Sequence, residues 1–84
     1  MIVRMWEGRA EPAGFAELIS WVCDTALPEF DHDPLHMGSE VFTSTDQRVV
    51  VISRWRSRPR SLPEPPVLLV ARPPHEWDFT QVDR

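Results

Sequence analysis

The sequence predicts an α+β domain, in which one helix packs on an antiparallel sheet in the order β-α-β-β-(arm)-β. Three observations predict this class. Residues 2–9 alternate with the period of a strand, an apolar stripe with helical spacing follows over residues 12–27, and the β-branched run at residues 49–52 is typical of a central strand. All 84 residues are expected to form a single domain.

The first strand is expected to carry apolar side chains on both of its faces. Successive side chains of a strand point to opposite sides of the sheet. Val3 and Met5 therefore share one side, while Ile2, Arg4 and Trp6 share the other. Neither side of the strand is expected to be fully open to water.

The helix is expected to begin at Pro12 and to end before Pro28. Pro12 suits a first helical turn because its ring fixes φ and it has no N–H to satisfy. Pro28 is expected to terminate the helix, since a proline disfavours the helical conformation in the residue before it. The apolar stripe has the i, i+3, i+4, i+7 spacing of a core-facing helix. It consists of Phe15, Leu18, Ile19, Val22 and Ala26.

The next two strands are expected to form a hairpin, and a proline-rich arm is expected to separate them from the last strand. Residues 37–43 and 48–56 predict two paired strands, and the second is expected to be covered on both faces. Residues 57–66 contain four prolines and predict an extended arm without a helix. Residues 67–71 predict a short strand or buried connector, and residues 76–82 a last strand.

The small size of the chain favours self-association. A domain of this length buries only about 60% of the surface that its unfolded chain exposes, less than a larger domain does. Cys23 is the only cysteine, so no internal disulfide can add stability. Cys23 itself is expected to be a small buried apolar residue of the helix. Oligomerisation is the expected source of further burial, and a homodimer is its simplest form.

The charge pattern excludes some partners. The net charge is −4, and phosphate binding needs a basic field, so nucleic acid is not an expected partner. Arg54, Arg56, Arg58 and Arg60 alternate along the chain, and a solvated strand edge accounts for them better than an anion site. No apolar run approaches a membrane span, and no signal segment is evident, so a cytoplasmic protein is expected.

Four segments, MIVRMWEGR (1–9), LPEF (27–30), VVVISRWRS (49–57) and PHEWDFTQV (74–82), together resemble the antibiotic biosynthesis monooxygenase-like family. The resemblance implies a ferredoxin-like fold and a dimeric α/β barrel, in which two sheets pack face to face around a cavity in each protomer. The chain departs from the family because a proline-rich arm replaces the second helix and because it has no Asn and no Tyr. Of the positions that carry function in that family, only one, a tryptophan, has a counterpart in this chain, at Trp55.

Two functions follow from this resemblance. The first is a cofactor-independent monooxygenase or cyclase-like enzyme acting on an aromatic or polyketide-type molecule. The second is a non-catalytic dimeric module that binds a hydrophobic aromatic ligand or accompanies a biosynthetic enzyme. The enzyme would use an aromatic cavity and polar groups that hold oxygen atoms, whereas the missing Asn, Tyr and second helix favour the module. The cavity residues are expected among Trp6, Phe15, Trp55 and Trp77, and the polar groups among Arg4, Arg54 and His75.

Two polar clusters are candidates for chemistry. His75 follows two prolines, and Asp78 could orient its imidazole as in a catalytic pair, although a partly exposed histidine is the simpler interpretation. Residues 29–36 contain Glu29, Asp31, His32, Asp33 and His36, which suit a divalent ion. Pro34 interrupts this segment, so a solvated acidic loop is expected there. No nucleotide fingerprint occurs, and no cofactor is expected.

Overall fold

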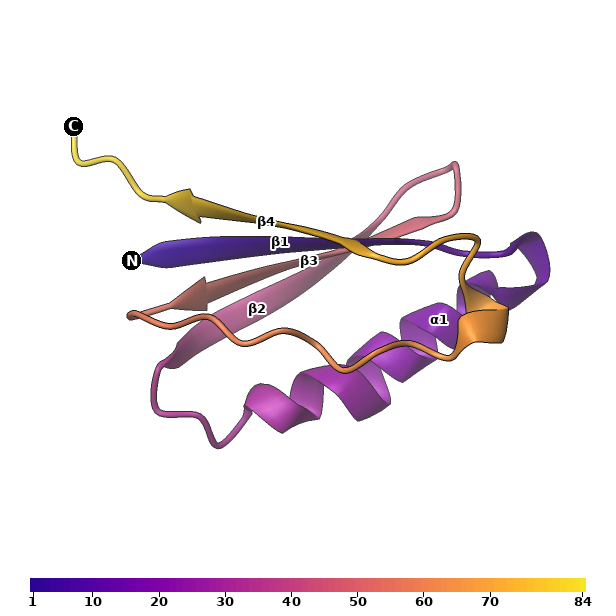
Figure 1. The fold of residues 1–84 in the computed structure, drawn as a ribbon, viewed down its shortest axis with the longest axis horizontal. Coiled ribbons are helices and arrows are strands. Elements are labelled where there is room, and N and C mark those ends of the chain that lie inside the picture. The colour runs from indigo at the N-terminus through magenta and orange to yellow at the C-terminus, as the bar shows by residue number, and fades with distance from the viewer.

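The computed structural model describes all residues, Met1–Arg84, and shows an α+β fold with one helical layer on a four-stranded antiparallel sheet (Figure 1). The strands are β1 (Ile2–Arg9), β2 (His36–Thr43), β3 (Arg48–Trp55) and β4 (His75–Thr80). Their order across the sheet is β2-β3-β1-β4. This arrangement is consistent with a ferredoxin-like fold in which the second helix is replaced by the arm, residues 57–66.

The helical segment is longer than the sequence predicts. It begins with the turn η1 (Pro12–Gly14), continues as α1 (Phe15–Trp21) and the wider turns of η2 (Val22–Ala26), and ends with η3 (Leu27–Phe30). The prediction that Pro28 terminates it is wrong. Pro28 lies in the first turn of η3, where its missing N–H interrupts no hydrogen bond. The extra turn carries Phe30 into the core, where it is 1% exposed.

The arm and the last strand agree with the predicted order but not with every predicted boundary. Residues 57–66 contain neither helix nor strand, and they run along the same side of the sheet as α1 (Figure 1). Residues 67–69 form a short 3-10 turn, η4 (Val67–Leu69), and Val70 makes one isolated bridge to Ala10. The last strand is shifted toward the N-terminus relative to the prediction, because it includes His75 and ends at Thr80.

The strand register divides the side chains between two faces of the sheet. Trp6 pairs with Val51 and Ile2 with Trp55, and these residues face the helix and the arm. The covered face and the helix together form the core. Its buried members are Trp6, Ala10, Leu18, Val22, Ala26, Phe30, Val49, Val51, Trp55 and Leu62.

Trp55 lies at the centre of an aromatic cluster at one end of this core. Its side chain is fully buried, the ring of Phe30 meets it edge to face at 4.8 Å, and the ring of His36 lies at 5.0 Å. Its indole N–H donates to Ser53 Oγ at 2.8 Å, so the one polar atom of the ring is satisfied. The interior position of Trp55 is therefore specified by both packing and a hydrogen bond.

The opposite face of the sheet has no cover within one chain. Val50 and Ile52 alternate with the buried residues of β3 and are only half-buried, so the expectation that β3 is covered on both faces does not hold within one chain. Beside them Phe42, Trp77 and Phe79 are 53%, 42% and 52% exposed. We call this surface the open sheet face. It comprises Val3, Met5, Phe42, Val50, Ile52, Trp77 and Phe79, together with the charged residues interspersed among them.

The burial of Trp55 predicts a stability effect. Trp55→Phe should lower the free energy of unfolding by about 1–3 kcal/mol, because the smaller ring leaves a void and removes the hydrogen bond to Ser53. Urea denaturation followed by circular dichroism measures this. Leu68→Ala, at a side chain that is 85% exposed, is the control and should change little. Equal stability of Trp55→Phe and wild type would contradict the packing described.

Candidate functional site

The four aromatic residues predicted to share a cavity do not lie together. Trp6 and Trp55 are buried in the core on the helix face of the sheet, with 3% and 0% exposure. Phe15 is half-buried and packs against that core from α1. Trp77 pairs with Met5 and lies on the open sheet face, on the other side of the sheet. A single aromatic cavity formed by all four is therefore not present within the chain.

His75 and Asp78 also lie on opposite faces, so the predicted pair is not formed. They are three residues apart on β4, and an odd spacing along a strand places two side chains on different sides of the sheet. The ring of His75 instead meets that of Trp77 edge to face at 5.6 Å. The carboxylate of Asp78 points to the helix face, where it meets Arg4.

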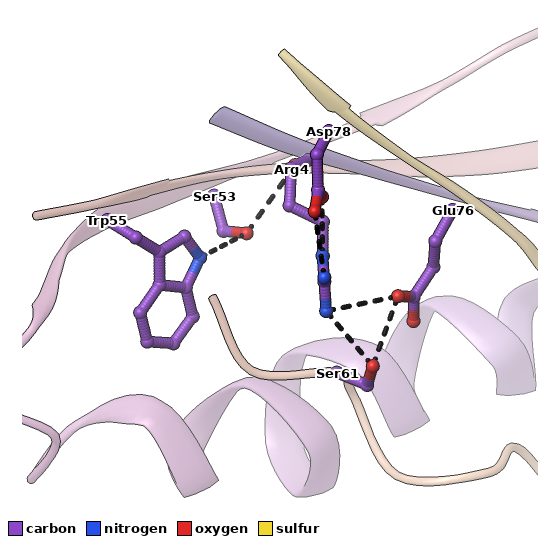
Figure 2. A network of polar contacts seen from close by, with 6 residues as sticks. All are labelled: Arg4, Ser53, Trp55, Ser61, Glu76 and Asp78. Atoms are coloured by element: carbon purple, nitrogen blue, oxygen red, sulfur yellow. Dashed lines mark hydrogen bonds and ion pairs between the residues drawn. The ribbon is translucent and has the colours of Figure 1, made fainter. Parts of the chain in front are cut away.

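Arg4 is the centre of the most connected polar network in the chain (Figure 2). Its Nε and one terminal nitrogen donate to the two carboxylate oxygens of Asp78, at 2.7 and 3.0 Å. Its other terminal nitrogen donates to Ser61 Oγ at 3.0 Å and lies 3.2 Å from Glu76. The network therefore joins β1, β4 and the arm.

The network also sets the ionisation of Asp78. The hydrogen bonds from Arg4 hold the pKa of Asp78 below its ordinary value, although partial burial acts in the opposite direction. The same hydrogen bond raises the pKa of Arg4. Both groups are therefore charged in neutral solution, and neither is poised to exchange a proton with a substrate.

The four alternating arginines do not converge on one site. Arg54 lies on the open sheet face, where its guanidinium pairs with both oxygens of Glu40 and lowers the pKa of that carboxylate. Arg60 lies 5.8 Å from the Phe30 ring and donates to the backbone oxygen of Glu29 at 3.0 Å. Arg56 is exposed. These separate surroundings offer no common anion-binding centre.

The acidic segment 29–36 is divided among different structural roles. His36 belongs to β2, and its Nε2 lies 2.8 Å from Ser39 Oγ. Asp33 accepts a hydrogen bond from the Leu35 backbone at 2.8 Å. The chain holds no group of three or more His, Cys, Asp or Glu side chains arranged to bind a metal. Cys23 is exposed, so the expectation of a buried apolar cysteine is wrong; the η2 turns carry it on the outer side of the helical segment.

The concave surfaces of the molecule lie along the helix and the arm. A cavity of about 300 Å³ lies between the arm and the start of β4, with Trp6 and Glu76 in its wall. We call it the arm cavity. A neighbouring cavity of about 430 Å³ is lined mainly by residues between Glu64 and Pro74, and an open groove of about 480 Å³ follows the outer surface of α1. Sequence reasoning missed the arm cavity, although the prolines at 63, 65, 73 and 74 that line it are visible in the sequence.

Comparisons of the chain with protein-family models, curated proteins and solved structures find no match. The resemblance to the antibiotic biosynthesis monooxygenase-like family therefore rests on the sequence segments alone. Among the helices of the structure, none is both long and apolar enough to cross a membrane.

The ion pair between Arg4 and Asp78 predicts a pH-dependent contribution to stability. Because folding lowers the pKa of Asp78, its stabilisation is present above the ordinary aspartate pKa of about 4 and is lost as the pH falls through the lower folded value. Asp78→Asn should reduce the free energy of unfolding at pH 7 by about 1 kcal/mol or less, since Asp78 is 47% exposed.

Urea denaturation of wild type and Asp78→Asn at neutral pH and near pH 2 measures this contribution. The difference between the two proteins should shrink toward zero at the acidic pH. Asp83→Asn, which removes a carboxylate outside the network, is the matched control. A difference that is the same at both pH values would show that Asp78 does not act through its charge.

Proposed function

We propose that the protein is a homodimeric, non-catalytic ligand-binding or accessory module of the dimeric α/β-barrel kind. The observation that carries this proposal is the open sheet face, which exposes three large aromatic side chains on a chain with only 14 buried residues. A contiguous exposed apolar patch marks an interaction surface. In the proposed dimer, two copies bury this surface against each other.

The charges on the open sheet face support burial against a second copy. Its two carboxylates are both paired inside the chain: Glu40 with Arg54, and Glu7 with Arg72 at 2.6 Å and with Arg48 at 3.5 Å. Covering the face would therefore leave neither carboxylate unpaired, which is the main penalty for burying charge. A two-fold interface brings the same patch together from both sides, so it must be self-complementary. A mainly apolar surface with internally paired carboxylates meets this requirement.

The geometry favours the non-catalytic module over the oxygenase or cyclase. A general base must face its substrate in a concave site. His75 faces the open sheet surface without a carboxylate partner, and Asp78 is held by Arg4. Trp55, the one position carried over from the resembling family, is sealed in the core and has no free surface for a ligand. The arm cavity, bordered by Trp6, is the place proposed for a small ligand with an apolar or aromatic body.

The dimer is tested by its mass and by variants of the open sheet face. Light scattering at micromolar concentration should give about twice the chain mass, because interfaces of this kind bury large apolar areas. Phe79→Ser combined with Trp77→Ser should shift the protein toward the monomer while the circular dichroism spectrum stays folded. Leu68→Ser removes an apolar side chain that is even more exposed, at 85%, but lies outside this face, and it should leave the mass unchanged. A folded wild-type monomer at these concentrations would overturn the proposal.

A further inference from the structure

His75 brings a titratable side chain to the open sheet face, at the start of the edge strand β4. It pairs with Glu7 of β1, and the same row across the sheet continues through Val50 of β3 to Phe42 of β2. Residues that lie opposite each other in an antiparallel ladder share one face, so the imidazole belongs to the surface that carries Val50 and Phe42. In a single chain His75 is exposed to water.

The imidazole is in contact with the aromatic part of this face. Its ring meets that of Trp77 edge to face, with the ring centres 5.6 Å apart. Trp77 pairs with Met5, and Met5 pairs with Ile52, so the tryptophan belongs to the apolar row beside it. Trp77 is 42% exposed, and an interface that covers this side chain also covers the ring in contact with it. Dimerisation through the open sheet face therefore removes His75 from water.

The carboxylate nearest to His75 is not free to balance a charge on it. Glu7, the cross-strand partner, is 8% exposed, and Arg72 of the turn before β4 holds one of its oxygens at 2.6 Å. Arg48 of β3 lies 3.5 Å from the other oxygen. Neither ring nitrogen of His75 has a hydrogen-bond partner in the chain. A proton added to the imidazole thus finds no free counter-charge next to it.

The rest of this end of the face and a second copy do not supply the missing carboxylate. Arg9, the next side chain of β1 on this face, is a further cation, and Asp46 is held by Arg48 at 3.2 Å. A second copy brings the same surface, where Glu40 is held by Arg54. Burying an ion without a partner is strongly unfavourable. The neutral imidazole carries no such penalty.

We propose that His75 makes dimerisation through the open sheet face dependent on pH. Histidine ordinarily changes its charge between pH 5 and 8. Because the exposed monomer accepts the proton and the covered dimer does not, the dimer is favoured above this range and weakens as the pH falls through it. The inference rests on the proposed dimer and adds its regulation; it does not involve the arm cavity.

The dissociation constant of the dimer at pH 7.5 and at pH 5.8, measured by analytical ultracentrifugation, tests the inference. It should rise by about ten-fold or more at pH 5.8, because each of the two copies carries the histidine. Both pH values lie above the isoelectric point of about 5.2, and the net negative charge shrinks toward the lower pH. Weaker repulsion between copies favours association, so the expected change runs against the effect of net charge. Circular dichroism at both pH values verifies that the chain stays folded.

Variants of His75 separate its charge from its packing. His75→Gln should keep the dimer and remove its pH dependence, whereas His75→Lys, a permanent cation, should raise the dissociation constant by about ten-fold or more at pH 7.5. His32→Gln, in the exposed turn after η3, is the matched control and should behave as wild type. A wild-type dissociation constant that is equal or lower at pH 5.8, or a pH dependence that persists in His75→Gln, would overturn the switch and leave the dimer in place. A wild-type monomer at both pH values would overturn the dimer and the switch together.

Discussion

The guanidinium group of Arg4 joins three segments that are distant in the sequence. It lies in β1 near the middle of the sheet, it binds Asp78 and Glu76 of the last strand, and it reaches Ser61 of the arm. The last strand is an edge strand whose six residues are all exposed, so its neighbours on β1 are its main support. The position of the arm, and with it the shape of the arm cavity, depends on the same contacts. Leu62 adds an apolar anchor one residue from Ser61.

The parts of the fold that the sequence predicts well are those with strong periodicity. β1 matches its predicted bounds, and β3 differs by one residue, because alternation and a β-branched run leave few other conformations for these segments. The predicted end of the helix was wrong because a proline such as Pro28 can either stop a helix or begin a new turn. Which one occurs depends on whether Phe30 finds space in the core, and that is a tertiary effect.

The candidate site was less predictable, for two different reasons. His75 is separated from Asp78, and Trp77 from Trp6, because side chains alternate along a strand and the pairing of β1 with β4 fixes which of them share a face. The predicted grouping of these residues could have been corrected from the strand register alone. The arm cavity could not be foreseen in this way. The prolines of residues 57–66 exclude regular secondary structure there, but they do not determine the path of the arm. That path is set by the side-chain contact of Ser61 with Arg4 and by the bridge between Ala10 and Val70.

The open sheet face and the covered face are built from the same strands by different means. On the covered face the polar side chains bond to one another or to the backbone, and Ser53 satisfies both the indole of Trp55 and a backbone oxygen of Arg4. On the open sheet face the charged side chains are neutralised by neighbours on adjacent strands, as Glu40 is by Arg54. Alternation along each strand thus separates a single-chain core from a surface suited to association.

The arm illustrates how a chain can cover a sheet without regular structure. No backbone N–H of residues 57–66 donates to another backbone group, so hydrogen bonds do not hold the arm in the way that they hold a helix. Prolines restrict φ in the unfolded chain as well as in the folded one, so less conformational entropy is lost when the arm is fixed in place. A few side-chain anchors are then sufficient to position it. The wall beside Trp6 is consequently stiff along the backbone yet attached at few points, which allows its side chains to be exchanged by mutation with little effect on the sheet beneath.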